Sequence, residues 1–303
     1  MNSVRNGLLV AVWAMAAVGA LGQSPTHVGN ATQASLTDVS QAQTKPLPEI
    51  ATLLRDAQAH QKQMETMRRN YIYKVVEVED DVDGDGKVKE STTEEREVFY
   101  IGRSQISRLL KKNGKELTEK EQEKEKERVE KAIESSKKRQ AKRDKDEEEG
   151  KKSENEITVE TFLRVCKFTN PRRETFKGRD TILFDFAGDQ NAKAKGMAEN
   201  ALKKLSGTLW IDEAGREVAR MEVRFEEAFK IGGGLVASIQ KGSKFTFEQA
   251  LINDEVWLPT YMEGQIAARV LLLKGIRQHS TSWFSDYRKF RASTTISLAD
   301  ENQ

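Results

Sequence analysis

Cysteine and histidine are nearly absent from this chain: of 303 residues, one is Cys and three are His. The single thiol, Cys166, cannot close a disulfide within the chain, so a packed core has to stabilise the fold. Its neighbours in FLRVCKF are apolar, which predicts a buried small hydrophobic residue and not a nucleophile. Because His27, His60 and His279 lie far apart, a zinc site would need carboxylates that the sequence does not identify.

Several motifs that carry chemistry are also missing. The sequence contains no HExxH, no GxSxG and no phosphate-binding loop. The glycines in IGGGL, Gly232 to Gly234, lack the following Lys and the strand-to-helix context of such a loop, and they predict a turn or a strand bulge. Lys and Arg number 50 and Asp and Glu 48, so no strong field of one sign favours nucleic acid. We therefore expect no enzyme activity, no cofactor and no nucleic-acid partner.

One acidic stretch, DVDGDGKVKESTTE, resembles the first half of a calcium-binding loop. Asp81, Asp83, Asp85 and Gly86 fit that pattern, but the twelfth position is Thr92 where a bidentate Glu is required. The flanking residues also alternate as strands do, whereas the calcium motif needs helices. The stretch predicts a hairpin turn, and no metal site is expected.

No apolar run is long enough to span a bilayer comfortably. The run from Leu8 to Leu21 follows Arg5 and ends in small residues, which indicates an export signal over residues 1–22. An uncleaved N-terminal anchor is the alternative interpretation. Residues 23–46 are polar and aperiodic and predict a disordered linker. The chain is therefore expected to be secreted across the inner membrane and to be periplasmic in a Gram-negative cell.

From Pro48 the pattern becomes regular. Apolar residues at helical spacing predict an amphipathic helix from Pro48 to about Arg69. The period then changes to two in NYIYKVVEVED and REVFYIG, which predicts a hairpin, and GRSQISRLLKKNG predicts a further strand ending at Gly114.

Residues 113–156 form a segment of a different composition, dominated by Lys and Glu. Pairs such as Glu127 and Lys131 stand four residues apart, which favours a helix. Its few apolar residues, among them Val129 and Ile133, do not make a coiled-coil seam. We expect a solvated charged helical insertion; a docking arm for an envelope protein, through residues 115–152, is the alternative.

The second half of the chain is dominated by strands. ITVETFLRVCKF is ambiguous between helix and strand, and GMAENALKKLSG predicts a short helix. In GTLWIDEAGREVARMEVRFEE, the turn EAGR separates two strands whose charged residues share the outward face, so cross-strand ion pairs explain them. ARVLLLKGI is apolar on both faces, which indicates that one of the two predicted helices covers its second face.

These features together resemble the LolA/LolB-type lipoprotein-carrier superfamily. The resemblance rests on the amphipathic helix followed by NYIYKVVEV, on the hairpin from Gly207 to Gly215, on VWLPTYMEG and on SWFSDYRKF. It implies an α+β fold, a strongly curved antiparallel sheet forming an unclosed barrel with helices packed on its concave side. It also implies a hydrophobic cavity that receives acyl chains or other apolar ligands. The charged insertion departs from that pattern.

The sequence therefore predicts one LolA-like domain, from residues 47–112 and 157–291, with a C-terminal tail at 292–303. We expect it to bind a lipid or an acylated protein in an apolar cavity, with peripheral contact to a membrane as a further possibility. Alternating apolar residues assign the lining to Phe184, Phe186, Met221, Val223, Phe225, Phe245 and Phe247. A non-enzymatic envelope scaffold with a filled core and a charged docking arm is the alternative, because cores and pockets use the same residues.

Overall fold

The structure is a computed structural model that describes residues 45–149, 157–270 and 274–290. The predicted signal peptide, nearly all of the predicted linker and the C-terminal tail lie outside these residues. The helices are α2 (Ile50–Arg68), α3 (Glu119–Glu148), α4 (Val159–Val165), α5 (Gly196–Leu202) and the 3₁₀ helix η1 (Gly232–Gly234). No helix in the described ranges is long and apolar enough to cross a membrane.

Strands make up most of the described chain, and they alternate apolar and polar residues as the sequence predicts. They are β1 (Tyr71–Val82), β2 (Val88–Ile101), β3 (Ser104–Lys112), β4 (Lys115–Glu116), β5 (Cys166–Phe176), β6 (Arg179–Gly188), β7 (Leu205–Asp212), β8 (Val218–Phe225), β9 (Phe229–Ile231), β10 (Ala237–Ile239), β11 (Lys244–Ile252), β12 (Val256–Val270) and β13 (Lys274–Lys289).

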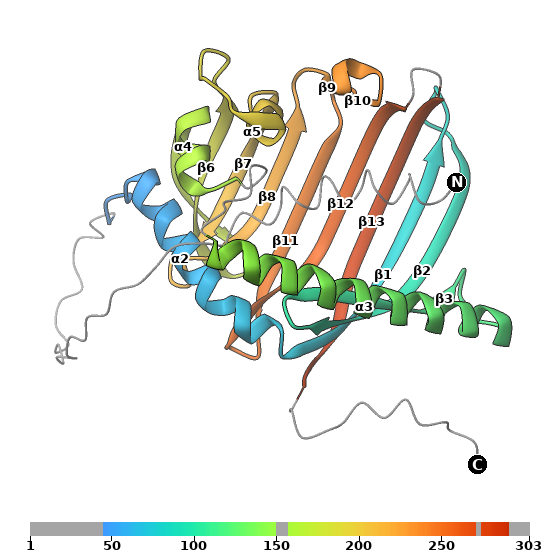
Figure 1. Ribbon diagram of the computed structural model, residues 1–303. Coiled ribbons are helices and arrows are strands. Elements are labelled where there is room, and N and C mark those ends of the chain that lie inside the picture. The colour runs from blue at the N-terminus through green and yellow to red at the C-terminus, as the bar shows by residue number, and fades with distance from the viewer. Residues whose placement is uncertain (1–44, 150–156, 271–273, 291–303) are drawn as a thin grey trace, which may run out of the picture.

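The strands form one antiparallel sheet in the order β4-β3-β2-β1-β13-β12-β11-β8-β7-β6-β5, and the β9–β10 hairpin joins it at β12 (Figure 1). Strands β4 and β5 end the order at opposite edges, so the sheet is open and not a closed barrel. The prediction of a large, unclosed antiparallel sheet with a few helices is confirmed.

The two predicted hairpins are present. β7 and β8 pair around the EAGR turn, and the charged residues of β8 form the expected ion pairs on one face. Arg220 contacts Glu222 and, across to β11, Glu248, while Arg224 contacts Glu226. The expected cross-strand pairing therefore holds for Arg220 with Glu248, while the other two pairs join residues two apart along the chain.

The ambiguous stretch ITVETFLRVCKF contains both a helix and a strand. The hydroxyl of Thr158 accepts a hydrogen bond from the backbone N–H of Thr161 at 3.2 Å, which caps the N-terminus of α4. The helix ends at Val165, and Cys166 begins β5 in an extended conformation. The change from helical to alternating period inside a few residues explains why neither pattern dominated.

Helices α2, α4 and α5 pack on one face of the sheet, called the inner face here. The main core cluster joins residues of these helices to strands β6, β7 and β8: Leu53, Leu54 and Ala57 of α2, Val159, Phe162 and Val165 of α4, Ala201 and Leu202 of α5, with Ile182, Phe184, Phe186, Leu205, Leu209, Ile211 and Phe225 of the sheet. A second cluster continues on the same sheet around Tyr73, Val98 and Phe284. The core thus lies between the helices and the inner face.

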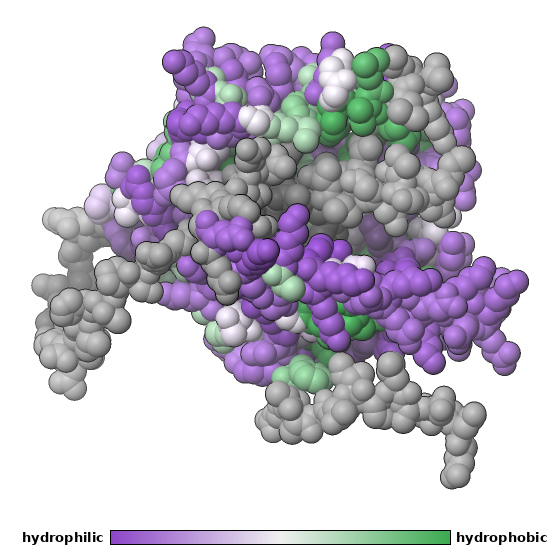
Figure 2. Space-filling view, viewed as in Figure 1, coloured by the Kyte–Doolittle hydropathy of each residue, from purple (hydrophilic) through white to green (hydrophobic). Residues whose placement is uncertain are grey.

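Helix α3 is less solvated than its composition suggests. It lies along β2 and β3 (Figure 1), and Glu125 and Ser136 on that side are only 9% and 1% exposed. Glu125 accepts a hydrogen bond from the backbone N–H of Leu109 at 2.6 Å, and Arg128 donates one to the backbone carbonyl of Ser107. The prediction of a solvated charged helix therefore does not hold for this stripe, while the opposite side is charged and exposed (Figure 2).

The expectation that a helix covers the second face of ARVLLLKGI stays a prediction, since Leu271 to Leu273 lie outside the described residues. Helix α2 contacts the start of β12, where Arg68 donates to the carbonyl of Trp257 at 3.0 Å. The other end of β12 pairs edge to edge with β10, Ala268 opposite Ile239.

Candidate functional site

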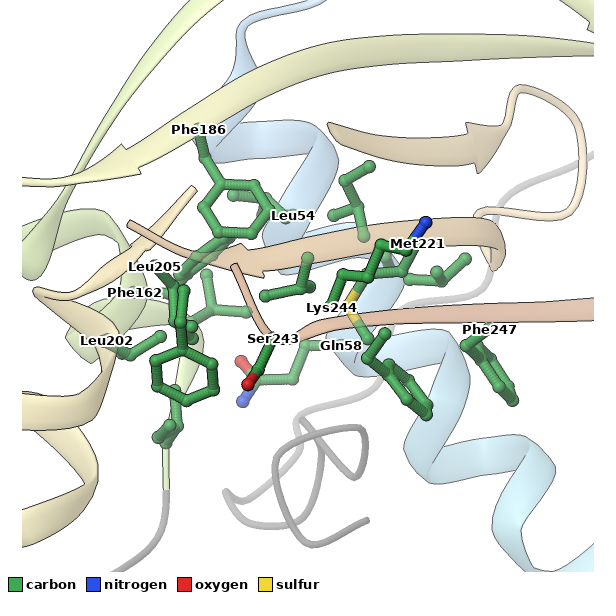
Figure 3. Close-up of a pocket in the computed structure, with 18 of the residues that line it drawn as sticks. Leu54, Gln58, Phe162, Phe186, Leu202, Leu205, Met221, Ser243, Lys244 and Phe247 are labelled. Carbon is green, nitrogen blue, oxygen red and sulfur yellow. The ribbon is translucent and has the colours of Figure 1, made fainter. Parts of the chain in front are cut away.

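A cavity opens on the inner face between helices α2, α4 and α5 and strands β6 to β8 and β10 to β12 (Figure 3). The side chains that line it are almost all apolar: Leu54, Ala57, Ile157, Val159, Phe162, Phe186, Leu202, Leu205, Leu209, Val218, Met221, Val223, Phe225, Ile239, Phe245, Phe247 and Ile266, with Gln58, Gln61, Ser243 and Lys244 as the polar members. We call it the inner-face cavity.

Six of the seven residues predicted to line a cavity do so. Phe186, Met221, Val223, Phe225, Phe245 and Phe247 all belong to the lining. The seventh, Phe184, is 0% exposed and lies in the core cluster, with its ring 5.7 Å from that of Phe168. Sequence alternation assigned the correct face to Phe184, but this side chain is buried in the core and does not line the cavity.

The strand register brings these six side chains together. Phe245 of β11 pairs with Val223 of β8, which pairs with Gly207 of β7, which pairs with Phe186 of β6. Directly paired residues of antiparallel strands project to the same face. A side-chain carbon on Gly207 would come within 2.8 Å of the Phe186 ring, so glycine at this position leaves room for that ring.

The inner-face cavity is narrow. The space that the centre of a water molecule can reach is about 110 Å³, several times the ~10–15 Å³ that a single water requires. The described residues of its lining include no Asp, Glu, His or Cys. A narrow apolar space whose one ionisable lining residue among those described is Lys244 is suited to holding a hydrocarbon chain.

The few polar side chains of the lining differ in how many hydrogen bonds they make within the protein. The Ser243 hydroxyl accepts from the backbone N–H of Ala267 at 3.1 Å and donates to its carbonyl at 3.2 Å. Gln58 and Gln61 stand one turn apart on α2, and no hydrogen bond joins their side-chain amides to another described residue. Figure 3 shows Gln58 pointing into the cavity. These two amides are the groups available to a carbonyl or hydroxyl of a bound molecule.

Helix α2, which forms one wall, is fixed to the sheet by a buried charged cluster. Glu217, 0% exposed, accepts a hydrogen bond from Arg68 at 3.0 Å, and its other carboxylate oxygen lies 3.0 Å from Nδ1 of His60. Gln249 of β11 donates to the same carboxylate at 3.3 Å. The cluster joins α2 to β8 and β11 and so holds the helical wall of the cavity over the strand wall.

Beyond Phe247 the inner face becomes polar. Register continues from Phe247 through Met262 and Ser282 to Glu77 of β1. Burial raises the pKa of Glu77 most, the negative charges of Glu79 and Glu94 add to the rise and the positive charge of Arg96 opposes it, so that the pKa reaches about 7. Strands β1 and β13 of the inner face therefore combine the apolar cluster around Tyr73 and Phe284 with a polar part around Glu77 and Ser282.

The remaining sequence candidates have structural roles. Asp83 of the DGDG stretch accepts backbone N–H groups of Lys87 and Asp85, both at 2.9 Å, and these bonds lower the pKa of its carboxyl. Its oxygens thus stabilise the turn between β1 and β2, and within the described residues no group of acids and histidines is arranged to hold a metal. Cys166 is 6% exposed, and burial raises the pKa of its thiol to about 12, which fits a packing residue.

Sequence reasoning missed the helical side of the cavity. Leu54 and Ala57 of α2 and Phe162 of α4 line it as closely as the predicted strand residues do. The apolar stripe of α2 was recognised, but its spacing says only that it packs on something. The position of Thr158 before a helical run was the available signal for α4.

Comparison with known proteins finds similar structures but no match by sequence. No protein-family profile and no curated protein match the chain. The structure is similar to an outer membrane lipoprotein-sorting protein domain from Vibrio parahaemolyticus, with 11% identity, 80% of this chain and 94% of that one covered, and a TM-score of 0.32. It is also similar to a DUF1329 family protein from Desulfovibrio piger, with 10% identity, 81% of this chain and 95% of that one covered, and a TM-score of 0.31. A LolA superfamily protein from Nitrosomonas europaea is similar with 11% identity, 79% of this chain and 92% of that one covered, and a TM-score of 0.25.

The resemblance to LolA-type proteins expected from the sequence thus recurs in the structural comparison. At TM-scores of 0.32 and below, these likenesses carry no argument about function, so function has to be inferred from the geometry of the inner-face cavity.

Proposed function

We propose that this protein binds the apolar chain of a lipid or of an acylated protein, reversibly, in the inner-face cavity. The observation that carries the proposal is the lining itself, in which apolar side chains from three helices and six strands surround a narrow space. Burying such a chain gains about 0.8 kcal/mol for each CH₂ group removed from water. The amides of Gln58 and Gln61 would then hydrogen-bond the ester or amide group at the end of the chain.

The proposal includes where the protein works and how its chain is divided. We propose an exported, periplasmic protein with one LolA-like domain from residues 47–112 and 157–291, interrupted by the charged helical insertion at 113–156. A carrier role without catalysis, cofactor, metal or nucleic acid is part of it. The charge balance of the chain and the absence of acids and histidines from the described cavity lining support this combination.

The test is to fill the cavity without introducing a charge. Ala57 of α2 is 4% exposed and lines the cavity, while Ala59, two residues along the same helix, is exposed. Ala57→Phe should occupy the space of the bound chain, and Ala59→Phe is the matched control because it adds the same ring to the outer side of α2. Native mass spectrometry and solvent extraction of protein purified from an envelope fraction would give the lipid content.

We expect wild type and Ala59→Phe to carry acyl species that leave only on denaturation, and Ala57→Phe to carry at least about fivefold less, which corresponds to about 1 kcal/mol of lost binding. A wild-type protein with no bound lipid, even after incubation with lipids, would refute the proposal. Equal lipid in the two variants would refute this cavity as the site.

The exposed side of α3 favours a second candidate, an interaction protein with a docking arm. Pairs such as Glu127 with Lys131 and Glu134 with Lys138 place alternating charges on that side. Deletion of residues 119–148, with Lys115–Thr118 joined to residue 149, separates the two functions. A carrier keeps its lipid after the deletion, whereas a docking protein loses its envelope partner in crosslinking experiments.

A further inference from the structure

An apolar tip stands at the end of the molecule where α5 and the β9–β10 hairpin meet. Leu235 and Val236 are 64% and 54% exposed, and Met197 of α5 is 49% exposed. The start of α5 and β9 line one shallow hollow, so Met197 lies beside the β9–β10 segment. Figure 2 shows hydrophobic residues gathered at the top of the molecule, over the position of β9 and β10 in Figure 1. Half of the six large apolar side chains that are exposed in the described ranges thus belong to one end.

The backbone holds this tip outward. Gly232, Gly233 and Gly234 have φ values of 58°, 66° and 93°, which are left-handed conformations that only glycine adopts at low cost. This turn interrupts β9 and β10 and leaves Leu235 and Val236 beyond the end of the sheet. Directly after them the chain returns to the sheet, and Ile239 lines the inner-face cavity. The tip is therefore only a few residues from the cavity wall.

The charges around the tip are positive. The acids in this region are neutralised by partners: Glu199 pairs with Arg164, Glu226 with Arg224 and Glu227 with Lys204. Lys195, directly before α5, and Lys230 of β9 form no salt bridge with another described residue. The side chain of Lys230 lies against Gly234, at the base of the tip. Apolar side chains beside these two lysines match an anionic lipid surface, where acyl chains lie below negative headgroups.

We propose that this tip, Leu235 and Val236 with Met197, inserts into an anionic bilayer while Lys195 and Lys230 contact the lipid headgroups. The proposal rests on the proposed function, because docking here places the inner-face cavity next to the bilayer from which a chain would enter or into which it would leave. It adds the partner surface and the orientation of the protein on that surface.

The test is cosedimentation with vesicles of phosphatidylcholine, with and without phosphatidylglycerol. The double variant Leu235→Glu/Val236→Glu is compared with Val88→Glu, which introduces one negative charge at another exposed apolar residue, 56% exposed, in the β1–β2 hairpin. We expect wild type and Val88→Glu to bind the anionic vesicles with equal affinity, and the double variant to bind at least about tenfold more weakly. Binding of wild type should also weaken as salt is added, since lysine–headgroup attraction is screened.

The proposal would be overturned if the wild-type protein did not bind anionic vesicles, or if the double variant bound them as tightly as the wild type does. Loading each variant with detergent-solubilised fatty acid separates this result from the carrier function, because that route needs no vesicle. A double variant that loads normally but does not sediment with vesicles supports docking by the tip. Ala57→Phe that sediments but does not load shows that the two properties fail independently.

Discussion

Replacing the buried carboxylate of Glu217 by an amide tests how helix α2 is held on the sheet. Glu217 is wholly buried and balances Arg68, whose side chain is 22% exposed, and it also contacts His60 and Gln249. In Glu217→Gln the guanidinium loses its counter-charge, and one amide N–H₂ group meets donors in place of the acceptor that stood there. Removing one partner of a buried ion pair costs about 3–5 kcal/mol. Because Arg68 keeps some contact with water, we expect about 3 kcal/mol here.

Urea denaturation followed by circular dichroism measures this loss. For a domain of this size, about 3 kcal/mol corresponds to a fall in Tm of roughly 6–12 °C. Glu222→Gln is the control, because Glu222 pairs with Arg220 on the outer face and is 45% exposed, so its loss should cost less than about 1 kcal/mol. Protease should also cut α2 faster in Glu217→Gln, since the helix is released from the sheet.

A second variant tests whether the stability loss comes from the ion pair itself or from a general disturbance of packing. Arg68→Met removes the guanidinium, so the unfavourable buried charge is absent from the double variant Glu217→Gln/Arg68→Met. We expect the double variant to be more stable than the sum of the two single losses predicts. A cost below about 1 kcal/mol for Glu217→Gln, or strict additivity with Arg68→Met, would refute the idea that this pair fixes α2.

Two further predictions concern titratable groups. The pKa of Glu77 is raised from 4.5 to about 7 in the folded protein, so between these pH values the folded state holds a proton that the unfolded state has lost. The free energy of unfolding should therefore fall by at most about 3 kcal/mol as pH rises from about 4.5 to about 7. Urea titrations of Glu77→Gln across that range should not show this fall, and an unchanged fall would contradict the assignment. Burial raises the pKa of the Cys166 thiol to about 12. This thiol should therefore not react with Ellman's reagent at pH 8 in the native protein, and it should react fully in urea. Rapid reaction of the native protein would instead show that Cys166 is at the surface.

Much of the sheet could be predicted from the sequence because alternation has a direct physical cause. Successive residues of a strand point to opposite faces, so the order Met221, Val223, Phe225 against Arg220, Glu222, Arg224 determines both the strand and its faces. Depth is not encoded in the same way. Phe184 and Phe186 share a face, yet only Phe186 lines the cavity, while Phe184 is wholly buried with the Phe168 ring 5.7 Å away.

The charged cluster under α2 shows what local patterns cannot supply. Glu217 follows the turn residues Glu213, Ala214, Gly215 and Arg216, where an acid is ordinarily solvated. Its partners Arg68 and His60 are 149 and 157 residues away in the sequence. Only the packing of α2 against β8 and β11 decides that this acid is buried and paired, and no periodicity within either segment contains that information.

Helix α3 has a consequence for how molecules of this protein behave next to one another. An open sheet has two edge strands, and free backbone N–H and C=O groups on an edge invite pairing with another sheet. β4 covers β3 only at Lys111 and Lys112. Farther along β3, the carbonyl of Ser107 and the N–H of Leu109 are occupied by Arg128 and Glu125, an ion pair on α3 that takes the place of a neighbouring strand.

The opposite edge, β5, is interrupted at Pro171, beside a register shift and the left-handed Asn170. Neither edge therefore offers a long, regular template for strand addition. We therefore expect these two edges to resist strand addition between molecules, and at β3 this resistance comes from side chains of the charged helix α3.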